Sequence, residues 1–342
     1  MKKFGILTGG GDCPGLNAVI CGVVSQCAAD GAEVFGFRAG WRGALENEGK
    51  WISKADVEGI QTEGGTILGT SRTNIMKVEN GPERVRQTMQ ELGLDAIIAI
   101  GGDDTLGVAA KLQDMGMNMV GVPKTIDNDL SCTDYTFGFD TAANIAMESI
   151  DRLHTTAKSH DRVIVVEIMG RHTGWIAVQA GMAGDAHVVM IPEFPMTVQQ
   201  CCDILLERKS RGHNYAIVAL AEGISIDELS EEDLPRDVFG NIAMVDKGIG
   251  ETLAKLIRER TGMETRHMVL GHLQRGGPPS LFDRVLGLRM GVKAAQCAIT
   301  GEYGYMMGLR GTEIVPELLS KAVDMRKEVD AELYHCAELL FG

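Results

Sequence analysis

The chain has 342 residues, of which 44% are hydrophobic, and its formal net charge is −14. Because a chain of this length rarely forms a single hydrophobic core, we expect two domains. The negative charge argues against nucleic acid or an anionic membrane as a partner, and no apolar run approaches the roughly 20 residues of a membrane-spanning helix.

The first third of the chain alternates β-rich runs with helical stretches, which predicts a parallel sheet covered by helices. We expect strands at 4–8, 33–37, 95–100 and 118–122, and helices at 16–29, 83–92 and 105–115. Glycines at 31, 93 and 116 follow these helices, as is common at helix ends. In open α/β sheets ligands bind at the carboxyl ends of the strands, so the loops there form the candidate site.

A second alternation begins after Phe139 and predicts a second α/β domain. We expect helices at 141–158, 198–208, 250–260 and 282–300, and strands at 162–168, 187–191, 215–220 and 268–270. Residues 225–247 are acidic and irregular, so we predict that they form a surface insertion.

Three consecutive glycines, Gly9 to Gly11, stand between the first strand and the first helix. Without Cβ atoms their N–H groups can approach an anion, and the start of the helix adds partial positive charge. The loop lacks the Gly-Lys-Ser/Thr of a Walker A motif, and its glycines do not match a dinucleotide-binding fingerprint. A phosphate-binding loop is favoured, and a tight turn without a ligand is the alternative.

Acidic residues follow the strand at 95–100. Asp103 and Asp104 come directly after two glycines. Adjacent carboxylates at a strand end suit a Mg²⁺ ion held against a polyphosphate. The alternative is that Asp104 or Thr105 only caps the next helix.

The strand at 118–122 leads into a loop that mixes charges of both signs. Asp127 and Asp129 lie two residues apart, and Lys124 stands just ahead of them. One carboxylate could accept a proton from a substrate hydroxyl, while Lys124 offsets charge on a phosphoryl group in transfer. The alternative is an acidic, solvated turn.

Several arginines adjoin a glycine or a strand end rather than a helix face: Arg72, Arg162, Arg171, Arg266 and Arg275. Arginine can grip phosphate oxygens through two parallel hydrogen bonds, so this placement favours an anion site. The alternative for any one of them is an ordinary surface or ion-pair residue.

Seven segments, taken in order, resemble the signature segments of the 6-phosphofructokinase family. They are TGGGDCPGLNAVI, GGDDT, PKTIDND, TFGFDTA, EIMGRHTGWIA, AEG and VLGHLQRGG, and together they span nearly the whole chain. The resemblance implies an α/β fold of two similar Rossmann-like lobes with the active site in the cleft. We expect a lobe for the phosphoryl donor and metal at 1–138 plus about 274–324, and a sugar-phosphate lobe at 139–273 plus about 325–342.

The resemblance also implies transfer of a phosphoryl group to the 1-hydroxyl of fructose 6-phosphate, in glycolysis and gluconeogenesis, with Mg²⁺ as cofactor. By matched position Asp127 is the general base, Asp103 holds the metal, and Gly11 and Arg72 contact the donor. The residues expected at the sugar phosphate are Thr125, Asp127, Arg162, Met169, Gly170, Arg171, Glu222, Arg266, His272 and Arg275. Those at 162 and 266 would come from a neighbouring subunit, which implies a homodimer or homotetramer with shared active sites.

Two residues favour pyrophosphate over ATP as the donor. ATP-using relatives in this family carry glycine at the positions of Asp104 and Lys124, and pyrophosphate-using relatives carry aspartate and lysine. A carboxylate at 104 would clash with the α-phosphate of ATP, and Lys124 can stabilise the transferring group without a nucleotide, so we group both with Asp127 as catalytic. Val108 replaces a glycine that leaves room for adenine. The reaction should be reversible, and an ATP-dependent 6-phosphofructokinase is the alternative.

Two other classes of protein fit less well. An NAD-dependent oxidoreductase needs an acidic residue about 20 residues beyond a proper glycine fingerprint, and the glycine spacing ahead of Glu33 fails. A non-catalytic phosphate-binding module would not need intact acids at 103 and 127. Cys21 and Ser25 stand where bacterial ATP-dependent relatives carry effector-binding arginines, so we expect no strong allosteric control.

The eight cysteines form no C-x-x-C pair and no zinc-type spacing, which predicts free thiols in a reducing compartment. The N-terminus reaches a glycine cluster within ten residues, too early for the apolar part of a secretory signal. A cytoplasmic protein is therefore expected. The choice between dimer and tetramer, and the use of sugar phosphates such as sedoheptulose 7-phosphate, stay open.

Overall fold

The structure is a computed structural model that describes residues 1–226, 229, 248–322 and 325–342. The chain divides into two compact units. Unit 1 comprises Met1–Asp140 and Arg275–Lys327, and unit 2 comprises Thr141–Gln274 and Glu328–Gly342. Most of the surface insertion that the sequence predicts at 225–247 lies outside the described residues.

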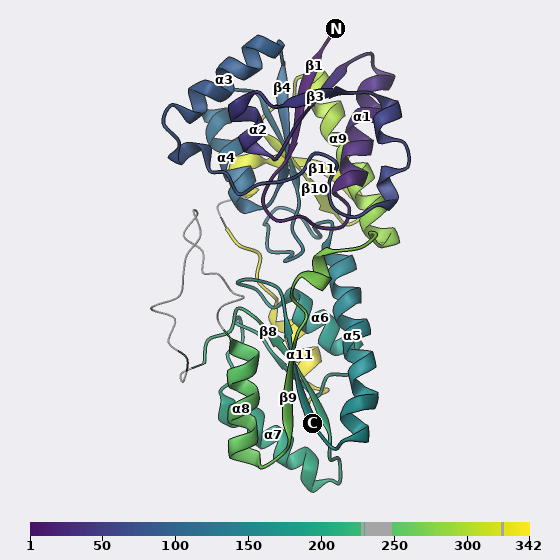
Figure 1. The fold of residues 1–342 in the computed structure, drawn as a ribbon, viewed down its shortest axis with the longest axis vertical. Helices are drawn as coiled ribbons and strands as arrows, with labels where there is room; N and C mark the ends of the chain where they lie inside the picture. Colours follow the sequence, from purple (N-terminus) through teal and green to yellow (C-terminus); the bar gives the residue numbers. More distant parts are fainter. Residues whose placement is uncertain (227–228, 230–247, 323–324) are drawn as a thin grey trace. The chain divides into compact units, whose positions relative to one another are not determined.

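Unit 1 contains a seven-stranded sheet with the order β11-β10-β5-β4-β1-β2-β3 (Figure 1). Its strands are β1 (Lys3–Thr8), β2 (Glu33–Phe37), β3 (Gly49–Ile52), β4 (Ala96–Gly101), β5 (Met119–Pro123), β10 (Tyr305–Arg310) and β11 (Glu313–Leu318). The inner strands are parallel, and the edge strands β3 and β11 pair antiparallel with their neighbours. Strands β4 and β5 are buried along their whole length, which explains their unbroken apolar sequences.

Helices cover both faces of this sheet. In Figure 1, α1 (Leu16–Ala29) and α9 (Leu281–Thr300) lie on one side, and α2 (Trp41–Glu46), α3 (Gly81–Leu92) and α4 (Asp103–Asp114) lie on the other. Helix α10 (Leu319–Ala322) follows β11, and short 3-10 turns occupy Lys54–Val57, Ile60–Thr62 and Ile75–Lys77. The main core cluster of unit 1 includes buried residues of β4 and of α2, α3 and α4, such as Ile97, Trp41, Val85 and Leu106.

Unit 2 contains a smaller, wholly parallel sheet with the order β7-β8-β6-β9. Its strands are β6 (Val163–Ile168), β7 (Val188–Met190), β8 (Ala216–Ala221) and β9 (Thr265–Val269). Helices α7 (Val198–Ser210) and α8 (Ile249–Thr261) pack together, and α8 covers β6 and β9. Helix α6 (Trp175–Ala183) covers β7 and β8 and contacts α11 (Ala331–Glu338), and α5 (Phe139–Ser159) lies beside α6 in Figure 1.

The predicted α/β class is confirmed, with differences at the ends of elements. Helix α4 begins at Asp103 rather than at residue 105. The strand predicted at 268–270 is wrong in its bounds, because β9 is an edge strand, largely exposed, and has no apolar run to mark it. Strands β3, β10 and β11 were not predicted. Strands β3 and β11 are short edge strands with exposed residues, whereas β10 is a mostly buried strand that the sequence analysis missed.

Within the described residues, no helix combines the length and the apolar character that crossing a membrane requires. All eight cysteines lie in described parts of the chain and are free thiols. Burial raises the pKa of Cys13, the thiol in the glycine-rich loop, to about 12, so it is protonated at neutral pH.

Candidate active site

The carboxyl ends of three neighbouring strands of unit 1 meet at one edge of the sheet. In the order β5-β4-β1, Thr8 pairs with Ile100 and Gly101 pairs with Pro123. The loops that follow these strands therefore begin side by side. The chain also changes direction here, because β2 lies beyond β1 while β5 lies beyond β4. Open α/β sheets bind ligands at such a point.

Thr105 packs the first two of these loops together. Its side chain is buried, and a Cβ on Gly9 would lie 2.5 Å from its Oγ1, with Gly101 leaving still less room. Glycine is therefore required at both positions by packing against one threonine. The sequence pointed to Thr105 only as a possible helix cap, but the N-cap residue of α4 is Gly102.

The segment at residues 70–72 is hydrogen-bonded to the glycine loop. Thr70 Oγ1 donates a hydrogen bond to the carbonyl oxygen of Gly10 (2.6 Å), and the Gly10 N–H donates to the carbonyl of Ser71 (3.0 Å). Ser71 Oγ in turn donates to the carbonyl of Ala39 (2.7 Å). These bonds place Arg72, predicted to contact the donor, directly after residues attached to the loop.

Lys124 lies against the same loop. Only 4% of this residue is exposed, and its Nζ donates a hydrogen bond to the carbonyl oxygen of Gly11 (2.6 Å). Burial lowers the pKa of Lys124, and the negative charges of Asp127 and Asp103 oppose that decrease. The ammonium group is thus held in place before any substrate binds.

Arg275 also contacts the glycine loop. Its Nη1 donates to the carbonyl oxygen of Asp12 (3.0 Å), and a Cβ on Gly11 would come within 2.6 Å of the same nitrogen. The sequence predicted Arg275 at the sugar phosphate, whereas this structure shows it beside the predicted donor loop. Two cationic groups, from Lys124 and Arg275, therefore converge on that loop.

Asp127 lies in a loop that is stabilised by hydrogen bonds among its own residues. Its side chain is largely buried, and its N–H donates to Thr125 Oγ1 (3.1 Å). The carbonyl of Thr125 accepts from Thr136 Oγ1 (2.8 Å), and the Thr136 N–H donates to Asn128 Oδ1 (3.1 Å). Thr125, predicted at the sugar, here supports the backbone of Asp127.

The acidic residues of two loops come within electrostatic reach of each other. Asp103 and Asp104 occupy the first turn of α4, where the helix dipole favours negative charge, and no side chain caps this helix, so the capping alternative is wrong. Burial raises the pKa of Asp129 to about 7, and the charges of Asp127 and Asp103 add to the increase. A cation at this edge would offset the repulsion.

Val108 has a different environment from the one its predicted role suggests. It is 4% exposed and belongs to the core cluster of unit 1. Gly107, beside it on α4, faces open space. Because the side chain of Val108 packs in the core, the argument about the donor depends on Asp104 and Lys124.

In unit 2 a single carboxylate joins the loops after β6 and β8. Glu222 Oε1 accepts hydrogen bonds from the N–H groups of Gly170 (3.3 Å) and Arg171 (2.9 Å). The neighbouring Met169 N–H donates to Oε1 of the buried Gln274 (3.0 Å). Four predicted sugar-phosphate residues are thereby brought together, and Gln274 is a supporting residue that the sequence analysis missed.

Arg162 and Arg266 lie at the opposite end of this sheet. Arg162 precedes β6 and Arg266 is near the start of β9, whereas the loop with Arg171 follows β6. Six residues of strand at about 3.3 Å each separate the two ends by about 20 Å. Glu264 Oε1 binds both arginines, at 3.1 Å and 2.6 Å. His272 lies in the 3-10 turn Gly271–Arg275 after β9 and is exposed.

Comparison with known proteins identifies the family of this chain. The family model described as Phosphofructokinase matches residues 3–298. The chain is 52% identical over 344 residues to the pyrophosphate--fructose 6-phosphate 1-phosphotransferase of Amycolatopsis methanolica, covering 99% of this chain and 100% of that one. The chain belongs to the phosphofructokinase family.

Relatives within the phosphofructokinase family differ in the donor that their names state. The ATP-dependent 6-phosphofructokinase 3 of Streptomyces coelicolor is 48% identical, over 98% of this chain and 99% of its own length. Among solved structures, the pyrophosphate-dependent phosphofructokinase from Marinobacter aquaeolei matches with a TM-score of 0.83 and 23% identity, over 100% of this chain and 92% of its own. At that identity the likeness shows the fold alone, and it confirms the fold predicted from the motifs.

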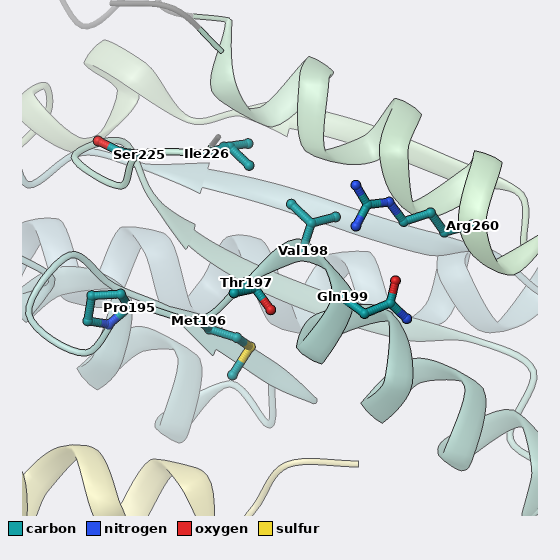
Figure 2. A pocket seen from close by; sticks show the side chains of 8 residues that line it. All are labelled: Pro195, Met196, Thr197, Val198, Gln199, Ser225, Ile226 and Arg260. Atoms are coloured by element: carbon teal, nitrogen blue, oxygen red, sulfur yellow. The ribbon is translucent and has the colours of Figure 1, made fainter. Parts of the chain in front are cut away.

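This phosphofructokinase-family chain also has a pocket of about 360 Å³ in unit 2, shown in Figure 2. Its lining comes from the start of α7, the segment before it, the segment after β8, and Arg260 on α8: Pro195, Met196, Thr197, Val198, Gln199, Ser225, Ile226 and Arg260. These described lining residues include none of those predicted to bind the sugar phosphate, so we do not assign the substrate to it.

Proposed function

We propose that this chain transfers a phosphoryl group from pyrophosphate to the 1-hydroxyl of fructose 6-phosphate, reversibly. The products are fructose 1,6-bisphosphate and phosphate. The observation that carries the proposal is the buried ammonium of Lys124, hydrogen-bonded to Gly11 inside a glycine-rich loop beside the acids of α4. The 52% identical relative whose name states this activity supports it.

The reaction depends on positioning and on neutralising charge. Asp127 accepts the proton of the 1-hydroxyl while that oxygen forms a bond to a phosphorus of pyrophosphate. The bond from this phosphorus to the bridging oxygen breaks, and phosphate leaves with the electron pair. Lys124, Arg72 and the N–H of Gly11 face the donor oxygens, where positive charge stabilises the transition state.

Asp104 determines the selectivity for pyrophosphate over ATP in this proposal. It stands in the first turn of α4, next to the loop that receives the phosphates. A second carboxylate there repels the α-phosphate of ATP, whereas pyrophosphate ends before it. Lys124, held at the glycine loop, can stabilise the transferring phosphoryl group without a nucleotide.

A divalent cation, Mg²⁺, is the cofactor in this proposal, and Asp103 would hold it. Burial is the main cause of the raised pKa of Asp129, and the negative charges of Asp127 and Asp103, which a cation would offset, add to it. Among the described residues no group of three or more His, Cys, Asp or Glu side chains is arranged to hold a metal. This suits Mg²⁺, which takes one or two carboxylates and completes its shell with phosphate oxygens and water. When bound, it neutralises charge on the donor phosphates.

Unit 1 is then the donor lobe, and unit 2 supplies most of the sugar-phosphate contacts through Met169, Gly170, Arg171, Glu222 and His272. Arg162 and Arg266 lie at the other end of the unit 2 sheet from Arg171, so they would serve the site of a neighbouring subunit. The enzyme in this proposal is a homodimer or homotetramer with shared sites. Its free thiols suit the cytoplasm.

An assay of the purified protein with fructose 6-phosphate, Mg²⁺ and either pyrophosphate or ATP tests the donor. We expect kcat/KM to be at least about tenfold higher with pyrophosphate. Equal or better turnover with ATP would refute pyrophosphate as the donor. Sedimentation of the same preparation at assay concentration tests the shared site, since full activity in a monomer would contradict it.

A further inference from the structure

The last residues of unit 1 contact the loop that contains Asp127. Lys327 is the last residue of unit 1, and its neighbour Arg326 forms an antiparallel bridge with Leu130, just past the loop. We propose that Lys327 is a positioning residue that sets the conformation of Asp127 and Asp129 by gripping Asn128 between them. This inference rests on the proposed role of Asp127 as the general base.

The ammonium of Lys327 donates hydrogen bonds to this loop and to the turn that follows it. Its Nζ donates to Asn128 Oδ1 (3.0 Å), to the carbonyl of Thr133 (3.1 Å) and to the carbonyl of Asp134 (2.6 Å). These acceptors match the three N–H bonds of an ammonium group. The backbone N–H of Lys327 adds a hydrogen bond to the carbonyl of Asp129 (2.8 Å). Lys327 therefore holds the loop through both its side chain and its backbone.

Asn128 is the residue through which this grip would reach the acids. It is 1% exposed and has a left-handed φ of 53°, which asparagine tolerates better than most side chains. Its Oδ1 accepts from both Lys327 Nζ and the Thr136 N–H (3.1 Å). Because Asn128 links Asp127 to Asp129, fixing its amide fixes the backbone on both sides.

Partial burial disfavours the charged form of Lys327, and neighbouring acidic residues favour it. Burial lowers the pKa of Lys327 to about 8, Asp134 and Asp129 oppose the decrease, and Arg310 adds to it. Lys327 is half-buried, and a lysine that loses part of its hydration usually has polar partners. The negative charge of Asp129 favours this ammonium, and the ring of Tyr135 lies 5.9 Å from Nζ.

The first test compares Lys327→Met with the wild type in steady-state kinetics. Methionine keeps much of the side-chain length but donates no hydrogen bond, so the loop should lose the three bonds from Nζ. We expect kcat to fall by about 10-fold to 100-fold, as for a small misplacement of a catalytic group, with KM for fructose 6-phosphate within about threefold. The matched control is Lys321→Met, on an exposed lysine of α10, which should leave both constants unchanged.

A double-mutant cycle separates positioning from a merely structural role. Asn128→Gly keeps the left-handed backbone and removes the amide that Lys327 holds. If Lys327 acts through Asn128, the double variant should have the kcat of Lys327→Met alone. Fully additive effects on kcat, or a Lys327→Met variant with the kcat of the wild type, would overturn the proposal.

Two further outcomes are separable. If Lys327→Met does not fold, Lys327→Arg replaces it, because a guanidinium group keeps the charge but cannot match the geometry of the three acceptors. A fall in kcat of at least about threefold then supports the proposal. A kcat equal to that of the wild type overturns it. Failure of the proposed function would show instead as a wild-type protein without pyrophosphate-dependent turnover, whatever residue 327 is.

Discussion

The backbone around Asp127 is fixed by neutral hydrogen-bonding groups. Thr125 Oγ1 accepts from its N–H, and the next residue, Asn128, is held by Thr136. Asparagine has nearly the shape of aspartate, so an amide at this position should leave these backbone hydrogen bonds in place. The chemical role of this residue can be separated from its structural role for that reason.

Asp127→Asn should lower kcat by about 10²-fold to 10⁴-fold, because the amide cannot accept the proton of the 1-hydroxyl. Steady-state kinetics with pyrophosphate and fructose 6-phosphate measures this. Asp114→Asn, an exposed acid at the end of α4, is the matched control and should change nothing. A kcat within about threefold of the wild type would remove Asp127 from the role of general base.

At the scale of elements, the first turn of α4 joins two glycine loops through one side chain. Thr105 fills the space that Cβ atoms on Gly9 and Gly101 would need. Strand pairing makes the loops after β1 and β4 begin side by side, and Thr105 packs them against each other. Local packing, and not backbone flexibility, explains glycine at 9 and 101.

Gly101→Ala should lower the free energy of unfolding by about 1–3 kcal/mol, because the new methyl group overlaps Thr105 in a packed core. Gly107→Ala, on the same helix but facing open space, should raise it by about 0.5–1 kcal/mol. Denaturant unfolding at a fixed protein concentration measures both. Equal effects of the two changes would contradict this account of the packing.

At the scale of the molecule, unit 2 has a buried histidine that couples its stability to pH. His187 is 5% exposed, and its Nδ1 accepts a hydrogen bond from the Ile217 N–H (2.9 Å), which requires an unprotonated nitrogen. Burial lowers the pKa of His187 to about 3, and the charges of Arg208 and His154 add to the decrease. The C-terminal Gly342 also donates to its carbonyl (3.0 Å).

Unit 2 should therefore lose stability as the pH falls below about 6.5, the pKa of an unfolded histidine. The unfolded chain then binds a proton that the folded chain excludes down to about pH 3. At pH 5 the loss is about 2 kcal/mol by this linkage. His187→Asn, whose Oδ1 can accept from the same N–H without titrating, should flatten the pH dependence of unfolding.

Thermal or urea unfolding between pH 5 and 8 measures that slope. The control is His160→Asn, an exposed histidine of unit 2, which should leave the slope unchanged. If His187→Asn and the wild type lose stability in parallel, the acid sensitivity arises elsewhere, for example in the carboxylates of this strongly acidic chain.

The sequence by itself determined the α/β class, most of the buried strands and the glycine-rich and acidic loops of the candidate site. These features are local: the unbroken apolar runs at β4 and β5 mark buried strands, and glycines and acids cluster directly after them. It also identified the chemical types needed for phosphoryl transfer, because Asp103, Lys124 and Asp127 stand within motifs that can be recognised without a structure. Exposed edge strands such as β9 and β11 escaped it, since they carry no such pattern.

Only the tertiary structure decided which of these residues meet. Gly10 and Thr70 are 60 residues apart in the chain, Gly11 and Lys124 are 113 apart, and Asn128 and Lys327 are 199 apart, yet each pair is joined by a hydrogen bond. Periodicity reports the environment of a residue relative to its own helix or strand and contains no information about such distant partners. Strand order brings these loops to one edge, and packing there determined which cation faces which carbonyl.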